Sequence, residues 1–145
     1  MTVTSVLAAT ARLLAISLLF HAIEMFLLSK QKAFFKIWSY QNLRADLKRA
    51  LPLPNFVITK LFSDESFKVL ACLNMLAALV GIFYLHAWPF VVLFLTHLIF
   101  CIRFRGTFNG GSDMMTFVVL TGILIALLST HPETQKLGLI YIAIH

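Results

Sequence analysis

Four long apolar runs leave this chain few ways to fold. They cover about residues 6–29, 67–85, 87–102 and 114–130 of its 145 residues. A helix needs about 20 apolar residues to cross a bilayer, and the backbone groups of a segment in lipid must be bonded internally. Because the runs do not alternate between apolar and polar residues, a transmembrane β-barrel is excluded. The runs therefore predict an all-α protein, a polytopic transmembrane helical bundle with four spans.

The composition agrees with lipid as part of the solvent. Hydrophobic residues make up 60% of the chain and charged residues 12%, whereas soluble domains contain about 25% charged residues. The net charge of +6 would suit a nucleic-acid-binding protein, but the basic residues lie beside the apolar runs. That placement favours anionic lipid headgroups over nucleic acid as partners. Cys72 and Cys101 lack the spacings of a zinc site or a disulfide framework, so no metal site is predicted.

A fifth apolar run, residues 137–145, is too short to cross a bilayer. As a helix its nine residues extend about 14 Å, roughly half of the hydrocarbon thickness. The run predicts a partial fifth span, either a short cap on the bundle or the start of a helix in a longer natural chain. Residues 1–145 are expected to form a single transmembrane domain.

The connection between the first two spans, residues 30–66, is predicted to lie along the membrane interface. Its first part alternates lysines with large apolar residues in the stretch KQKAFFKIWSY. Leu43, Leu47 and Leu51 then recur every four residues among basic residues, which indicates a short amphipathic helix. Ser63 is expected to cap the second span, followed by two acidic residues that suit a helix N-terminus.

The basic residues also predict an orientation. Arg103 and Arg105 follow the third span, whereas the second connection has no lysine or arginine and the fourth has one. The positive-inside rule then places the first and third connections in the cytoplasm and the N-terminus outside. We expect the membrane to be a bacterial inner membrane. The basic residues in or beside the first connection are Lys30, Lys32, Lys36, Arg44, Lys48, Arg49, Lys60 and Lys68.

Polar side chains within the spans are the candidates for function, because their burial in lipid is costly. His21 and Glu24 are three residues apart and share a helix face, and His97 lies in the third span at a similar predicted depth. These three residues are the candidates for catalysis. His21 and His97 are also candidate ligands of a b-type haem, or could line a quinone site. Hydrogen-bonded contacts between helices explain them more simply, and no cofactor is predicted.

The stretch RFRGTFNGGSD, residues 103–113, separates the third and fourth spans. Asparagine and glycine adopt turn conformations at low cost, and Ser112 or Asp113 suits the N-cap of the following helix. The stretch therefore predicts a turn. Its arginines, its glycine-rich backbone and the helix N-terminus would together also favour an anion or a lipid headgroup. The candidate binding residues are Arg103, Arg105, Asn109, Gly110, Gly111 and Asp113.

Three features together resemble HTTM-domain membrane proteins: Arg12 early in the first span, RALPLP before the second, and NGGSD at the fourth. That family is related to the membrane domain of the vitamin K-dependent γ-carboxylase, and DoxX-type proteins have a similar four-helix core. The resemblance covers roughly residues 10–130. It implies a helical membrane bundle in which NGGSD is the polar loop. It does not imply carboxylase activity, because the chain lacks the large soluble domain of the carboxylases.

These observations predict an integral membrane protein that serves as an accessory or interaction subunit of a membrane complex. It would bind lipid or another membrane protein, or form a homo-oligomer, through its apolar faces and its basic connection. The chain is small and shows no complete catalytic set, so the prediction leans away from an enzyme. The alternative is a membrane-embedded enzyme or redox protein that acts on a quinone or a lipid-like substrate.

Overall fold

A computed structural model describes residues 2–104, 110–129 and 131–145 of the chain. Every regular element within these residues is an α-helix, which confirms the predicted all-α fold. The elements are α1 (Val3–Leu28), α2 (Lys32–Trp38), α3 (Tyr40–Ala50), α4 (Asn55–Phe62), α5 (Asp64–Phe83), α6 (Ala87–Phe104), α7 (Gly110–Leu128) and α8 (Pro132–Ile144).

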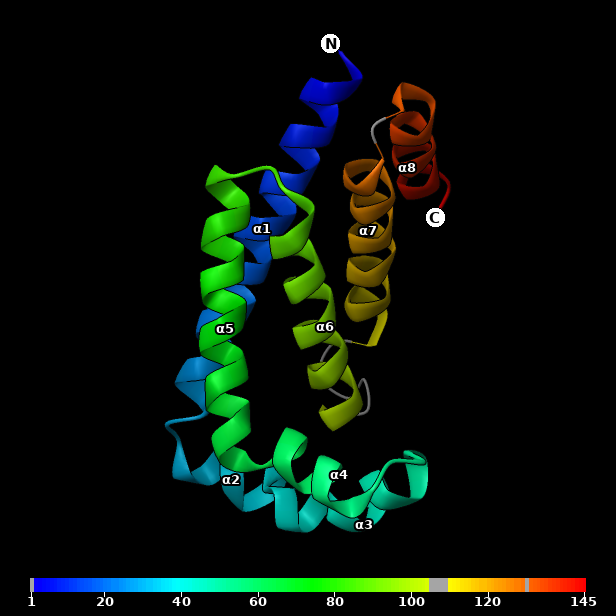
Figure 1. Cartoon of the computed structure of the whole chain (residues 1–145). Helices are drawn as coiled ribbons and strands as arrows, with labels where there is room; N and C mark the ends of the chain where they lie inside the picture. The colour runs from blue at the N-terminus through cyan, green and yellow to red at the C-terminus, as the bar shows by residue number, and fades with distance from the viewer. Residues whose placement is uncertain (1, 105–109, 130) are drawn as a thin grey trace.

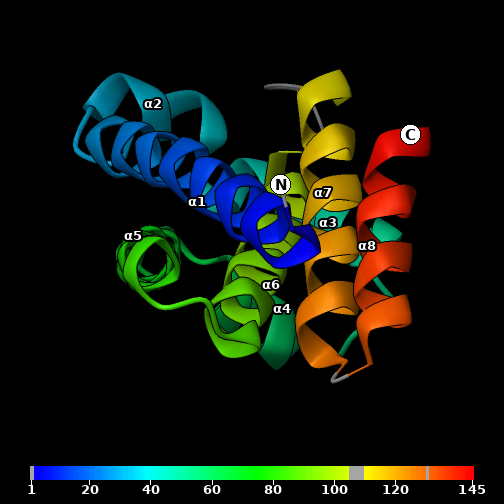
Figure 2. The same ribbon diagram turned by 90° about the horizontal axis from the view of Figure 1, so that it is seen from above.

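The long helices α1, α5, α6 and α7 run alternately down and up, and the short helices α2–α4 cross one end (Figure 1). Along the chain α5 packs on α6, α6 on α7 and α7 on α8, while α1 packs against α5. Seen from above, α1 is tilted across the bundle (Figure 2). The C-terminal end of α6 and the N-terminal end of α7 point toward the end that holds α2–α4.

Three of the helices, α1, α5 and α6, are long and apolar enough to cross a membrane, which fits a membrane protein. The apolar part of α7, Asp113–Leu128, is shorter. Large apolar side chains lie exposed on the outer faces of α1 and α5, and Phe20 and Phe83 are 68% and 72% exposed. In water a surface of this kind would promote association, whereas acyl chains solvate it without cost.

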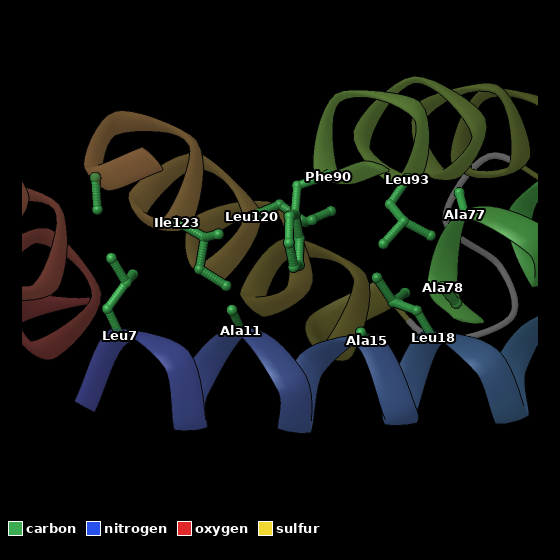
Figure 3. Close-up of a cluster of buried hydrophobic side chains, with 11 residues drawn as sticks. Leu7, Ala11, Ala15, Leu18, Ala77, Ala78, Phe90, Leu93, Leu120 and Ile123 are labelled. Carbon is green, nitrogen blue, oxygen red and sulfur yellow. The ribbon is translucent and has the colours of Figure 1, made fainter. Parts of the chain in front are cut away.

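Small residues let the long helices approach closely in the centre of the bundle. Ala11 and Ala15 of α1 and Ala77 and Ala78 of α5 are all buried, and a side chain larger than alanine at these positions would push the helices apart. Figure 3 shows α1 presenting this face to the other three helices. The labelled apolar side chains that complete the cluster are Leu7, Leu18, Phe90, Leu93, Leu120 and Ile123.

The second span begins as predicted, with a serine cap. The Ser63 hydroxyl oxygen accepts a hydrogen bond from the backbone N–H of Ser66 at 3.0 Å, and Asp64 and Glu65 occupy the first turn of α5. This cap satisfies one of the N–H groups that a helix start leaves without an intrahelical partner. The helix itself starts three residues before the predicted span, because the polar cap residues are already helical.

The predicted interfacial connection is folded against the bundle as α2, α3 and α4. Phe34 of α2 stacks on Phe67 of α5 with ring centroids 5.7 Å apart, and it also contacts Phe104 of α6. Leu47, Ile58 and Phe62 form a second apolar cluster, which packs against Ile99 and Ile102 of α6. Aromatic packing therefore holds α2 on α5 and α6, and the apolar cluster holds α3 and α4 on α6.

Two glycines bring α7 and α8 into direct backbone contact. A methyl group added at Gly138 would clash with the carbonyl oxygen of Gly122 and would lie 2.9 Å from the Cβ of Ala126. Gly122 and Ala126 are four residues apart, so they form one small-residue face of α7. By contrast, a methyl group at Gly81 of α5 would lie 3.4 Å from the Phe90 ring, which is ordinary contact.

We therefore expect the same substitution to act differently at two glycines. Gly138→Ala should destabilise the protein by about 1–3 kcal/mol, because the new methyl group overpacks the α7–α8 contact. Gly81→Ala should be neutral or stabilising by up to about 1 kcal/mol, because alanine favours the helix and the space exists. Thermal unfolding in mild detergent, with protease resistance of residues 131–145, measures both effects. Equal behaviour of the two variants would contradict the close α7–α8 contact.

Candidate functional site

A small cavity lies between α1, α6 and α7. Its residues include Phe104 at the C-terminal end of α6 and Asp113 near the start of α7, and these helix ends point toward α2–α4 (Figure 1). The volume of the cavity is about 10 Å³, which is close to the space that one water molecule or one small ion needs. The lining residues are His21, Met25, His97, Phe100, Cys101, Phe104 and Asp113. Three helices therefore bring polar groups together at one point inside the bundle, where His97 is buried and His21, Cys101 and Asp113 are half-buried.

Helix geometry explains how each polar group reaches the cavity. His97 and Cys101 are four residues apart on α6, so both side chains lie on the same helix face. Asp113 lies in the first turn of α7, where the helix dipole favours a negative charge. His21 comes from α1, one turn before Met25. The site therefore depends on the packing of helices that are distant in sequence.

The polar groups are close enough to act together. His97 Nε2 lies 3.6 Å from Asp113 Oδ1. One donor atom each of His97, Cys101 and Asp113 lie within 4.8 Å of one another. The rings of His21 and His97 meet edge to face, with centroids 5.8 Å apart. The arrangement combines imidazole, thiol and carboxylate, which are the side chains that hold transition metals and transfer protons.

His97 differs from the other buried polar groups in lacking partners. It is 2% exposed, and neither of its ring nitrogens makes a hydrogen bond to any residue that the structure describes. On the same helix, the Thr96 hydroxyl accepts a hydrogen bond from the Asn74 amide at 2.8 Å. The sequence-based interpretation of His97 as a hydrogen-bonded contact between helices is therefore wrong within the described residues. A buried polar group without a partner calls for an explanation.

The other sequence-predicted residues lie apart from this cavity or outside the described residues. Glu24 is exposed on α1 and does not line the cavity, although His21, three residues before it, does. Arg105 and Asn109 lie outside the described residues. Gly110 and Gly111 form the first turn of α7, so the prediction that they make a turn before the helix was wrong. The predicted N-cap at Ser112 or Asp113 was wrong as well, because both residues already lie inside the helix. Glycine adopts helical backbone angles as readily as turn angles, so its presence alone does not end or delay a helix.

Arg103 is buried at the end of α6 and is only 2% exposed. Its guanidinium donates to the carbonyl oxygens of Phe62, of Ser63 at 3.0 Å and of Trp38 at 3.0 Å. It also pairs with the Asp64 carboxylate at 2.6 Å. Those carbonyls belong to the C-terminal ends of α2 and α4, where helices leave acceptors unsatisfied and favour cations. Arg103 therefore anchors the short helices to α6. The prediction that it binds an external anion or a lipid headgroup was wrong, because its guanidinium already bonds to these groups of the protein.

Within the described residues, the cavity is much smaller than a haem or a quinone. A haem between His21 and His97 needs a flat slot wide enough for the porphyrin ring, and the rings here meet edge to face across about 10 Å³. A quinone ring is likewise far larger than one water molecule. The site instead has the size and the donor atoms for a single ion or a shared proton.

Sequence reasoning missed four of the residues that line the cavity, Met25, Phe100, Cys101 and Phe104, and one member of the Arg103 network, Asp64. Cys101 was interpreted as an apolar thiol, although its spacing of four residues from His97 places two potential ligands on one helix face. That spacing was the available signal. Met25 and Asp64 offered none, because only the packing of α1 and α5 brings them to their partners.

Comparisons of this chain with protein-family models, with curated proteins and with solved structures found no match. The resemblance to HTTM-domain and DoxX-type proteins therefore stays a prediction.

Removing the carboxylate of Asp64 should destabilise the protein, because the buried Arg103 charge loses its counter-ion. A fully buried pair broken in this way costs about 3–5 kcal/mol, and we expect about 2 kcal/mol for Asp64→Ala because the Asp64 side chain is 38% exposed to solvent. Glu65→Ala, in the same helical turn, removes an exposed carboxylate and should change stability by less than about 0.5 kcal/mol. Unfolding of both variants in detergent tests the expectation; equal effects would contradict it.

Proposed function

We propose that the chain is a multi-pass protein of a bacterial inner membrane, with α1, α5, α6 and α7 as its four spans. The 19 residues of α7 extend about 28 Å, which approaches the hydrocarbon thickness. The first connection holds most of the lysines and arginines of the chain and forms α2–α4, so the positive-inside rule puts that end of the bundle in the cytoplasm. In this orientation α2–α4 lie along the inner interface, and their basic residues meet anionic headgroups.

Cysteine labelling tests the number of spans and the orientation. In a chain carrying Cys72→Ser and Cys101→Ser, single cysteines replace the exposed residues Gln41 and Glu133, which lie on either side of α5, α6 and α7. A membrane-impermeant maleimide should label position 133 in intact cells and position 41 only after lysis. Labelling of both positions from the same side would contradict four spans, and the reverse pattern would contradict the orientation.

We further propose that the protein acts through the site formed by the buried His97 and the half-buried His21, Cys101 and Asp113, as a membrane-embedded enzyme or redox protein. The observation that carries this proposal is His97, a buried imidazole without a hydrogen-bond partner among the described residues, facing Asp113 in a cavity. Natural proteins keep such unsatisfied polar groups mainly where function needs them. The site supports this function better than the accessory-subunit hypothesis, which has only the exposed apolar faces as support. Every membrane protein presents such faces to lipid.

Two neighbouring substitutions on α6 separate a functional site from a structural one. His97→Leu removes an imidazole without partners, so the free energy of unfolding should stay the same or rise by about 1–2 kcal/mol. Thr96→Val, the matched control, leaves the Asn74 amide without its hydrogen bond and should cost about 1–3 kcal/mol. Unfolding is measured in detergent with EDTA present. A loss of stability in His97→Leu as large as in Thr96→Val would show a structural role and contradict the proposed function.

A further inference from the structure

We propose that His97, Cys101 and Asp113 bind one divalent transition-metal ion of the zinc class, with His21 as the fourth ligand. This inference rests on the proposed function, since it names the ligand of the same site. It goes against the sequence-based prediction, which found no metal site. Donor chemistry, geometry, the state of His97 and charge balance each support it.

The donor atoms suit zinc in type and nearly in position. Imidazole nitrogen, thiolate sulfur and carboxylate oxygen are the protein ligands of Zn²⁺, at about 2.0–2.3 Å from the metal. A tetrahedral site with such bonds separates its ligand atoms by about 3.3–3.8 Å. His97 Nε2 and Asp113 Oδ1 already lie 3.6 Å apart. All three donor atoms lie within 4.8 Å, so rotations that move the widest pair by about 1 Å complete the set.

The positions of the four proposed ligands on their helices also suit a metal site. His97 and Cys101 occupy positions i and i+4 of α6, the spacing by which one helix face supplies two ligands to one ion. Asp113 and His21 approach from α7 and α1 and line the same cavity. A cavity of about 10 Å³ has room for a single ion and for nothing larger than a water molecule.

His97 supplies an observation that is independent of the cluster itself. A neutral imidazole buried to 2% exposure normally finds partners for both nitrogens, and within the described residues His97 has none. Its Nε2 faces the carboxylate oxygen of Asp113 at a distance too long for a hydrogen bond but suited to two ligands of one ion. A metal would therefore satisfy a group that the protein leaves unsatisfied.

The charges of the ligands favour a divalent ion. When the metal binds, the S–H bond of Cys101 breaks, sulfur bonds to the metal, and the proton leaves to solvent without any change in oxidation state. One thiolate, one carboxylate and two neutral imidazoles then carry two negative charges, which a divalent cation neutralises. A monovalent cation would leave a net negative charge in an apolar bundle, where charge is costly.

Cobalt titration of the purified full-length chain tests the site. After treatment with a chelator, the detergent-solubilised protein is titrated with Co²⁺, which replaces Zn²⁺ and is visible in absorption. We expect one equivalent to bind, with a thiolate-to-cobalt charge-transfer band in the near ultraviolet and the visible bands of tetrahedral cobalt. Zn²⁺ should displace the cobalt and raise the temperature of unfolding.

Matched variants assign the ligands. Cys101→Ser should abolish the charge-transfer band, whereas Cys72→Ser should keep it. His97→Ala and Asp113→Asn should each weaken cobalt binding by at least about tenfold. Glu24→Gln, which removes an exposed carboxylate of α1 one turn from His21, should leave binding unchanged.

The outcomes separate this inference from the proposed function. Absence of cobalt binding, or binding that survives in both Cys101→Ser and His97→Ala, overturns the metal site. If His97→Leu is nevertheless as stable as the parent protein, the buried site keeps its proposed functional role with another ligand, such as a shared proton. If His97→Leu is destabilised in EDTA like Thr96→Val, the proposed function fails as well.

Discussion

The ion pair between Arg103 and Asp64 holds the two parts of this structure together. Arg103 ends α6, and its guanidinium reaches the carbonyl ends of α2 and α4 while it pairs with the start of α5. Asp64 also accepts the backbone N–H of Tyr40, the first residue of α3, at 2.9 Å. A cation at two helix C-termini and an anion at two helix N-termini each lie where the helix dipoles favour them. The short helices thereby become a fixed layer on the bundle.

This network also explains why a full positive charge is tolerated away from water. Three carbonyl oxygens and one carboxylate surround the guanidinium, and the centroid of the Phe67 ring lies 5.0 Å from its central carbon. Breaking such a set leaves several groups without partners at once, so the cost of losing one member exceeds the value of a surface ion pair. His97 is the opposite case, because it is a buried polar group whose hydrogen-bonding capacity is not satisfied by the described residues. His97 has the burial of Arg103 but none of its hydrogen bonds within the described residues.

Much of the architecture could be predicted from the sequence because it depends on local patterns. Apolar runs of span length fixed the all-α class, and a serine followed by two acidic residues fixed the start of α5. The site could be predicted only in part. His21, His97 and Asp113 were chosen because polar groups in apolar spans are costly, and the structure brings them to one cavity. Glu24 met the same criterion and lies exposed, because the criterion does not say which side of a helix faces its neighbours.

The sequence by itself determined that this chain forms apolar helices, and which of them carry polar side chains, because both depend on the order of neighbouring residues. Only the tertiary structure decided what those side chains do. In the folded protein, Arg103 bonds to Asp64 and to helix ends more than 35 residues away in the sequence, and not to an external anion. It also joined Cys101 to His97, Asp113 and His21 from three helices. Contacts between helices depend on tilt and on small residues such as Gly138 and Ala15, and these set distances that no single stretch of sequence contains.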